Sequence, residues 1–281
     1  MATSLKSDPR WVYAILLLVI TVPLLTHASV AVPISATTLT LYQFIQDLPR
    51  NSLVVESFDY ATSAVPELHP QAIVVTQHLF LRPLKILFVA LDNNGPTLAE
   101  SVLDTVNKSN KTYGVDYANL GWIPNTATLI GVLSNISQFL PLDIHGNPTA
   151  SLPIIKEFSG VKLASLVITF DDDSGNTNSY IQYWEGPYKI PVAAGTTASL
   201  APGFMPLYNS GQVIGVLFSV RAAAEYDELL YQQYHCCLGI GGASSTMVAL
   251  SASNLLIVAM VAFANVAYFI GRRTSQRSNR T

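Results

Sequence analysis

The segment "KILFVALD" (residues 85–92) decides the fold class of this sequence. Six consecutive apolar residues stand between a lysine and an aspartate, and polar side chains do not alternate with them. Such a run is typical of a strand that is buried on both faces, as in a parallel sheet covered by helices. The following segment, 95–111, carries Leu98, Val102 and Val106 at helical spacing. Together the two segments predict a strand followed by a covering helix.

The same order of a strand and then a helix recurs along the middle of the chain. Parallel strands need long crossover connections, so this alternation predicts a parallel sheet. We therefore expect a doubly wound α/β domain over residues 33–245, with a mostly parallel five-stranded sheet of the Rossmann or flavodoxin type. The other strands are expected at 52–60, 117–123, 161–170 and 190–197, and the other helices at 66–82, 126–140, 176–188 and 210–234.

Two long apolar segments, residues 11–32 and 246–271, flank this domain. Each is long enough to cross a hydrocarbon core of about 30 Å at a rise of about 1.5 Å per residue. We expect both to be transmembrane helices, which leaves 1–10 and 272–281 as short terminal segments. For the first apolar segment, a cleaved secretory signal is the alternative, because a basic start precedes it and small residues follow it.

The basic residues predict the orientation of these segments. Six of the Lys and Arg residues lie on the outer sides of the two apolar segments, and on the inner sides only Arg50 lies near a segment. Basic residues next to a membrane span are retained in the cytoplasm. We therefore expect a two-span protein of the cell membrane, with both termini in the cytoplasm and the middle domain outside.

The charge of the middle domain limits its partners. It holds nine Lys and Arg residues against 17 Asp and Glu residues, a net charge of −8. A domain of this charge repels the phosphates of nucleic acids, so no nucleic-acid partner is expected. The expected partner is the lipid bilayer.

Three stretches of the chain carry a resemblance to a family. They are "SFDY" with "PELHP" (57–60 and 66–70), "YGVDYANLGW" (113–122) and "APGFMPLYNSGQVIGVLFSVRAAAEYDELL" (201–230). With them the chain resembles a family of uncharacterised prokaryotic membrane-anchored proteins with a Rossmann-like middle domain. The resemblance implies the same architecture, and it implies no activity or catalytic residue.

Polar residues end every predicted strand, and in open α/β sheets ligands bind beyond the carboxyl ends of the strands. Converging carboxylates at this edge can be bridged by a divalent cation such as Ca²⁺ or Mg²⁺. Alternatively, "DDDSGN" (171–176) forms a turn and caps a helix, and its spacing matches no calcium-loop pattern. The ligand-binding candidates are Asp59, Asp92, Asn93, Asn125, Asp171, Asp172 and Asp173.

The common catalytic motifs are missing from the sequence. No G-x-G-x-x-G or P-loop lysine follows the first strand, and neither G-x-S-x-G nor H-E-x-x-H occurs. This favours a ligand- or partner-binding domain that acts as a receptor, scaffold or assembly component. The alternative is a metal-assisted enzyme for group transfer or hydrolysis that uses the acidic edge. The Pro- and Gly-containing stretch 201–212 is expected to be a lid, a partner contact or a packed connection.

Two features near the second apolar segment concern association. The adjacent Cys236 and Cys237 are either small apolar residues, partners in a disulfide between subunits, or lipid-modified thiols. The second segment contains small residues together with Asn254 and Asn265, a composition that lets helices approach closely and form hydrogen bonds. We expect a homo-oligomer that associates through the transmembrane helices.

Overall fold

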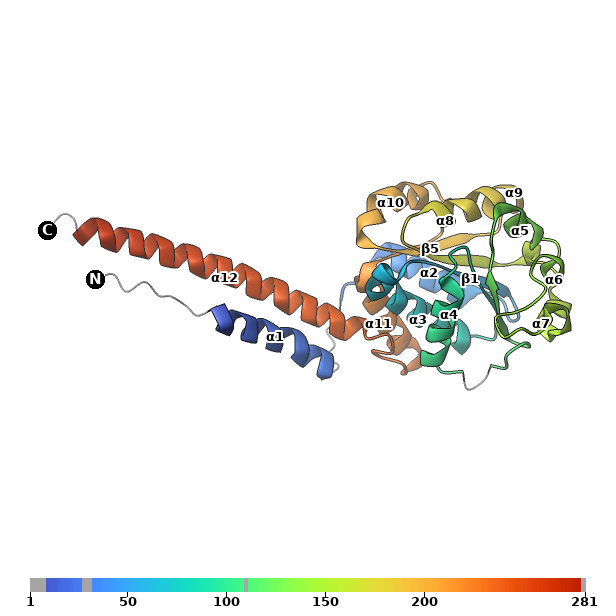
Figure 1. Cartoon of the computed structure of the whole chain (residues 1–281), viewed down its shortest axis with the longest axis horizontal. Coiled ribbons are helices and arrows are strands. Elements are labelled where there is room, and N and C mark those ends of the chain that lie inside the picture. The colour runs from blue at the N-terminus through green and yellow to red at the C-terminus, as the bar shows by residue number, and fades with distance from the viewer. Residues whose placement is uncertain (1–8, 27–31, 109–110, 279–281) are drawn as a thin grey trace. The chain divides into compact units, whose positions relative to one another are not determined.

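The computed structural model describes residues 9–26, 32–108 and 111–278, and the chain divides into two compact units. One unit is the α/β domain, Ala31–Ala243, and the other consists of the terminal segments Met1–Val30 and Ser244–Thr281. Figure 1 shows the elements of both units with the labels used below.

The α/β domain contains one sheet of six strands, all of whose neighbouring strands are parallel. The strand order is β3-β2-β1-β4-β5-β6. This confirms the predicted α/β class and the parallel sheet, and it corrects the predicted strand number of five. The strands are β1 (Leu53–Asp59), β2 (Lys85–Ala90), β3 (Tyr117–Trp122), β4 (Leu166–Asp171), β5 (Val192–Thr196) and β6 (Val216–Phe218).

The sixth strand lies inside a segment that the sequence predicts to be one helix, residues 210–234. Only the part from Ser219 to Tyr234 is helical, as α11, while Val216 and Leu217 are fully buried in β6 beside β5. No polar loop separates the strand from the helix, and Ser219 makes the turn with a φ of 59°. Three apolar residues joined directly to a helix show no period of their own, so the strand has no signature in the sequence.

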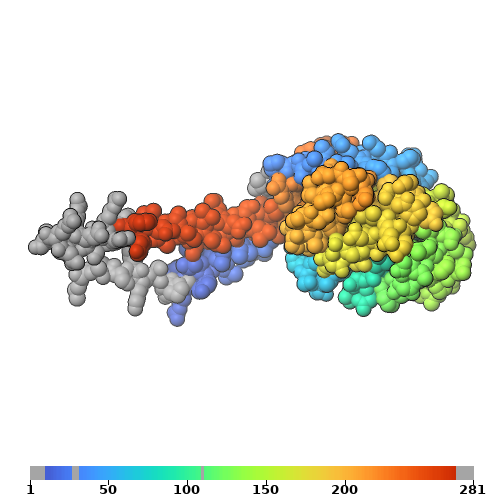
Figure 2. All heavy atoms as spheres, turned by 90° about the horizontal axis from the view of Figure 1, so that it is seen from above, coloured from blue at the N-terminus to red at the C-terminus, as the bar shows by residue number. Residues whose placement is uncertain are grey.

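Helices cover both faces of the sheet, as a doubly wound fold requires. Besides α11, the α-helices of the domain are α2 (Ala36–Asp47), α3 (Val65–Leu81), α4 (Gly95–Thr105), α5 (Thr126–Gly131), α6 (Ile136–Phe139), α7 (Pro153–Glu157), α8 (Gly175–Tyr180), α9 (Gly186–Tyr188) and α10 (Ala201–Asn209), and a π-helical turn, Ile181–Glu185, joins α8 to α9. Figure 1 shows α3, α4 and α11 on one side and α8, α9 and α10 on the other, and in Figure 2 the yellow to orange residues of α8 to α10 lie side by side.

Buried polar side chains link the sheet to its helices on one face and join the helices to one another on the other face. On the α8 side, the Trp184 ring packs edge-on against Tyr180, and the Tyr180 hydroxyl donates to Ser57 Oγ over 2.8 Å. On the α3 side, the buried His78 stacks on Tyr42, with its ring nitrogens 2.7 Å from the Tyr226 hydroxyl and 2.9 Å from Gln46 Oε1. Burial, and then the charge of Arg82, lower the pKa of His78 to about 3, so its ring is neutral at physiological pH.

The stretch 201–212 is largely helical. It forms α10 as far as Asn209, and Phe204 is fully buried under the helix. Cys236 and Cys237 form a disulfide with each other, a pairing that differs from all three sequence-based interpretations.

Among the described residues of the terminal unit, one helix is long and apolar enough to cross a membrane by length and composition. This is the stretch Ala243–Phe269 of α12 (Ala243–Ser278). The first apolar segment forms α1 (Pro9–Leu25), which has 17 residues and is shorter than the roughly 20 that a span requires. The structure therefore supports one candidate span and does not support the second span predicted at 11–32, of which residues 27–31 lie outside the described residues.

Candidate functional site

The centre of the sheet is a topological switch point between β1 and β4. From β1 the chain continues to β2 and β3 on one side, and from β4 it continues to β5 and β6 on the other. In open α/β sheets, the loops diverge at the carboxyl ends of two such strands and leave the place where ligands bind. The last residues of the two strands, Asp59 and Asp171, are register partners, so two predicted site residues stand side by side at this point.

The Asp59 side chain is almost completely buried, and only one of its carboxyl oxygens has a partner. Oδ1 accepts a hydrogen bond from the Leu91 backbone N–H, whereas Oδ2 has no hydrogen-bond partner among the described residues. Burial, and then the charge of Asp171, raise the pKa of Asp59 to about 8. Asp59 therefore carries a proton at neutral pH and presents a buried carboxylic acid at the switch point.

Asp171 is also buried, but its oxygens are well supplied with donors. Oδ2 accepts from the Thr177 N–H at 2.7 Å and from Thr177 Oγ1 at 2.9 Å, and Oδ1 accepts from the Asp173 N–H at 3.3 Å. Burial still raises the pKa of Asp171, to about 6. At neutral pH the pair therefore consists of an ionised Asp171 beside a protonated Asp59, which avoids two adjacent buried charges.

The next two aspartates hold the loop that follows β4. Asp172 Oδ2 accepts from the Ala61 N–H at 3.0 Å, which ties this loop to the one that follows β1. The exposed Asp173 accepts from the Gly175 N–H at 2.7 Å, and Ser174 adopts a φ of 73°. Residues 171–176 thus make the hydrogen bonds of a turn leading into α8, and the carboxylates of Asp172 and Asp173 remain accessible to solvent.

The other predicted site residues lie after β2 and β3. Asp92 accepts from the Asn94 N–H at 2.8 Å, and Asn93 is exposed beside it in the loop after β2. Asn125 follows the edge strand β3 and caps α5, with its Oδ1 accepting from the Thr128 N–H at 3.0 Å. By strand order, the structure brings the loop of Asp92 beside Asp59 and leaves Asn125 two strands away from β1.

Within the described residues, no group of three or more His, Cys, Asp or Glu side chains could hold a metal ion. The acidic residues at this edge are instead distributed between buried positions, turn hydrogen bonds and the surface. A divalent cation at the edge stays a prediction of the sequence that these side-chain positions do not favour.

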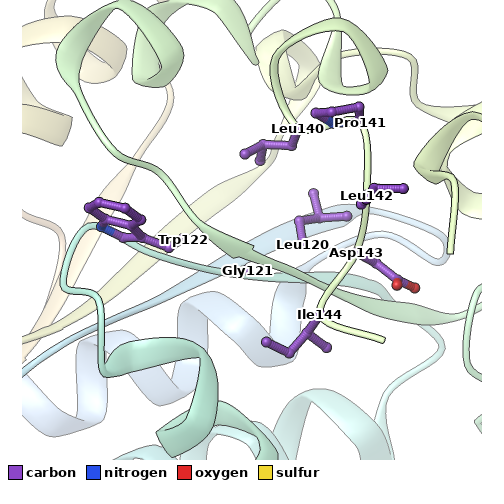
Figure 3. Close-up of a pocket in the computed structure, with 8 residues that line it drawn as sticks. All are labelled: Leu120, Gly121, Trp122, Leu140, Pro141, Leu142, Asp143 and Ile144. Atoms are coloured by element: carbon purple, nitrogen blue, oxygen red, sulfur yellow. The ribbon is translucent and has the colours of Figure 1, made fainter. Parts of the chain in front are cut away.

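Sequence reasoning missed an apolar pocket beside the edge strand β3. The pocket has a volume of about 320 Å³, and Figure 3 shows it between Leu120–Trp122 and the segment Leu140–Ile144. Trp122 and Leu142 are 47% and 55% exposed, so two large apolar side chains of the pocket lie at the surface together. The signal in the sequence is the alternation of Leu140, Leu142 and Ile144, a strand-like pattern in a stretch that Pro141 prevents from being helical.

Comparison with models of protein families, with curated proteins and with solved structures finds no match to this chain. The family resemblance drawn from the sequence therefore stays a prediction.

Proposed function

We propose that this chain is a membrane-anchored protein whose α/β domain lies outside the cytoplasm and binds a small polar ligand at the switch point. The observation that supports this most strongly is the pairing of Asp59 with Asp171 at the carboxyl ends of β1 and β4. Buried carboxyl groups with raised pKa values cluster at functional sites, and the unpartnered Asp59 Oδ2 is a donor or acceptor that a ligand can satisfy.

The groups that surround this position define the chemistry of the ligand. The partly exposed carboxylate of Asp172 and the exposed one of Asp173 lie after β4, and Asp92 with the Asn93 amide lies after β2, on the other side of β1. The carboxylates are hydrogen-bond acceptors and give this edge a negative net charge, and no Lys or Arg residue stands in either loop. They suit a ligand that carries hydroxyl or ammonium groups.

Melting temperatures of the detergent-solubilised full chain test this proposal with three probe classes: a polyamine (spermidine), a polyol (a hexose) and a divalent cation (Mg²⁺ or Ca²⁺). We expect spermidine or the hexose to give a saturable rise, because a ligand that binds only the folded state stabilises it. Asp172→Ala should weaken that rise by removing a partly exposed carboxylate and the link to Ala61.

The matched control is Asp104→Ala, which removes a carboxylate that is 83% exposed on α4. An equal loss in this variant would mean general charge attraction, and the absence of any saturable rise would reject a ligand site at the switch point. A rise with Mg²⁺ or Ca²⁺ alone would instead support the metal-assisted enzyme.

The pocket beside β3 supports a second candidate function, the binding of a protein partner. Exposed large apolar side chains gathered at an edge strand are a common feature of interaction sites. Trp122 is the most suitable anchor, because tryptophan is enriched among residues that dominate binding energies. In this interpretation the domain is a scaffold or assembly component, and the oligomer predicted from α12 would present several copies of the pocket.

The membrane topology gives a direct prediction. We propose that both termini lie in the cytoplasm and that residues 11–32 cross the membrane as well. Lys6 and Arg10 precede this segment, and the basic stretch "RRTSQR" (272–277) follows the apolar part of α12, so both outer flanks carry the basic residues that are retained in the cytoplasm. Protease added to intact cells should therefore remove the α/β domain. Digestion only after lysis would show that the domain faces the cytoplasm, and a cytoplasmic reporter at the C-terminus controls for cell integrity.

A further inference from the structure

A pocket of about 340 Å³ lies at the opposite, amino edge of the sheet from the switch point, and it does not depend on the function proposed above. It is formed where α3 ends and the chain enters β2, with Arg50 before β1 and Lys111 before β3 completing it. Its size lies within the range of about 300–1,000 Å³ in which small ligands are bound.

This pocket is positively charged, whereas the domain as a whole is negatively charged. Its lining includes Arg50, Arg82 and Lys111, three of the nine basic residues of a domain whose net charge is −8, and no Asp or Glu. In the described part of the chain, the ion pairs involve none of these three residues. Three cations without an ion-pair partner around one cavity create a positive potential that attracts an anion.

Arg82 and Lys111 are held in place by backbone carbonyls and keep donors in reserve. Arg82 Nη2 donates to the Leu48 carbonyl at 3.0 Å, and Lys111 Nζ donates to the Leu84 carbonyl at 2.7 Å. The Arg82 Nε–H is buried and has no acceptor among the described residues. A guanidinium has five N–H donors and an ammonium has three, so one fixed bond leaves most of them available.

The burial of Lys111 and the other lining residues also suit an anionic ligand. Burial, with the nearby Lys85 acting in the same direction, lowers the pKa of Lys111 against the influence of Asp116, so an anion beside Lys111 would relieve the cost of its charge. Asn107 supplies an amide to the lining, and Phe80 and Leu81 supply an apolar wall that suits the organic part of a ligand.

We propose that this pocket binds a phosphate-bearing anion through Arg50, Arg82 and Lys111. Arginine pairs bidentately with phosphate oxygens, and an unpartnered buried Nε–H is the kind of donor that such an oxygen satisfies. The phosphate belongs either to a soluble compound or to a phospholipid headgroup, two sources with the same chemistry.

The test uses the full chain in an uncharged detergent and measures its melting temperature in sodium phosphate against sodium chloride at equal ionic strength. We expect a rise with phosphate that saturates below about 10 mM. Arg50→Gln should weaken phosphate binding about tenfold, since a charged hydrogen bond is lost. Arg50 makes no other hydrogen bond or ion pair within the described residues, so this variant keeps the fold even if Arg82→Gln does not.

Lys108→Gln is the matched control, because it removes a cation three residues from Lys111 that does not line the pocket. Glycerol 3-phosphate and nanodiscs with or without phosphatidylglycerol separate the two sources. If glycerol 3-phosphate raises the melting temperature more than inorganic phosphate does, the ligand is a soluble compound. If the melting temperature rises only in phosphatidylglycerol nanodiscs, the ligand is a phospholipid headgroup. The proposal would be overturned by equal melting temperatures in phosphate and chloride together with no rise in glycerol 3-phosphate or in phosphatidylglycerol nanodiscs. It would also be overturned if Arg50→Gln and Arg82→Gln bound phosphate as tightly as the wild type.

Discussion

The free energy of unfolding should fall by on the order of 3 kcal/mol between pH 6.5 and pH 8. Two buried carboxyl groups cause this: Asp59 and Glu56, whose pKa values burial raises to about 8. Glu56 lies in β1, where Oε2 accepts from Thr76 Oγ1 at 3.0 Å and Oε1 has no partner within the described residues. Both groups keep a proton in the folded state that they lose on unfolding, so the stability they contribute is lost as the pH rises through about 8.

The lower limit of this window is set by histidine. The pKa of His78 is lowered to about 3, so this group acts in the opposite sense, and stability rises with pH up to its unfolded value of 6.5. Below pH 6.5 the carboxyl and histidine contributions oppose each other. Above pH 6.5 the falling contribution of the two carboxyl groups dominates. The loss of stability that they cause is therefore measured best between pH 6.5 and pH 8.

Asp59→Asn gives the decisive comparison. We expect it to remove about half of the pH dependence and to leave a protein about 1–2 kcal/mol more stable than the wild type at pH 8, because a buried charge is no longer formed. Urea unfolding of the detergent-solubilised chain at several pH values measures this. Asp173→Asn is the control, since Asp173 is exposed and an asparagine keeps its oxygen for the Gly175 N–H. If the free energy of unfolding of Asp59→Asn changed with pH as steeply as that of the wild type, Asp59 would already be ionised in the folded state.

Gly95→Ala should destabilise the fold by about 3 kcal/mol. Gly95 is the first residue of α4 and is buried against the sheet at the switch point. A β-carbon there would overlap the Phe58 carbonyl oxygen and the Ala90 β-carbon, which belong to the central strands β1 and β2 and have no room to move. The helix would have to withdraw from the sheet.

Gly203→Ala is the matched control for this change. Gly203 lies in α10 with no atom within 4 Å of the position of its β-carbon, so alanine should raise stability by about 0.5–1 kcal/mol through helix propensity. Denaturation midpoints of the two variants should therefore move in opposite directions. A midpoint of Gly95→Ala equal to that of the wild type would mean that α4 adapts to the added carbon.

Much of this fold follows from the pattern of apolar residues. The run at 85–92 predicts β2, and the alternation of strands and helices predicts a parallel sheet, because these segments are long and each has a clear period. The sequence does not predict β6, because this strand is three residues long and joins α11 without a loop. The first apolar segment looks long enough for a span from composition alone, but its described helix ends at Leu25.

The candidate site was predictable only in part. That Asp59 and Asp171 lie at the carboxyl ends of their strands follows from the end of each apolar run. That they are neighbours depends on strand order, which no local pattern encodes. The basic pocket was hidden for a similar reason, because Arg50, Arg82 and Lys111 are far apart in sequence and meet only through the packing of their elements.

The pairing of β1 with β4 also has a consequence for the order in which the protein assembles. The strands β1, β2 and β3 with their helices are complete before β4 is synthesised, whereas β1 lacks its second neighbour until the chain has passed Asp171. Contacts of such large sequence separation form late and slowly in folding. The pair of aspartates therefore comes into existence only when the two halves of the domain join, and a ligand bound there would act as a clamp on that final step, slowing the separation of the halves.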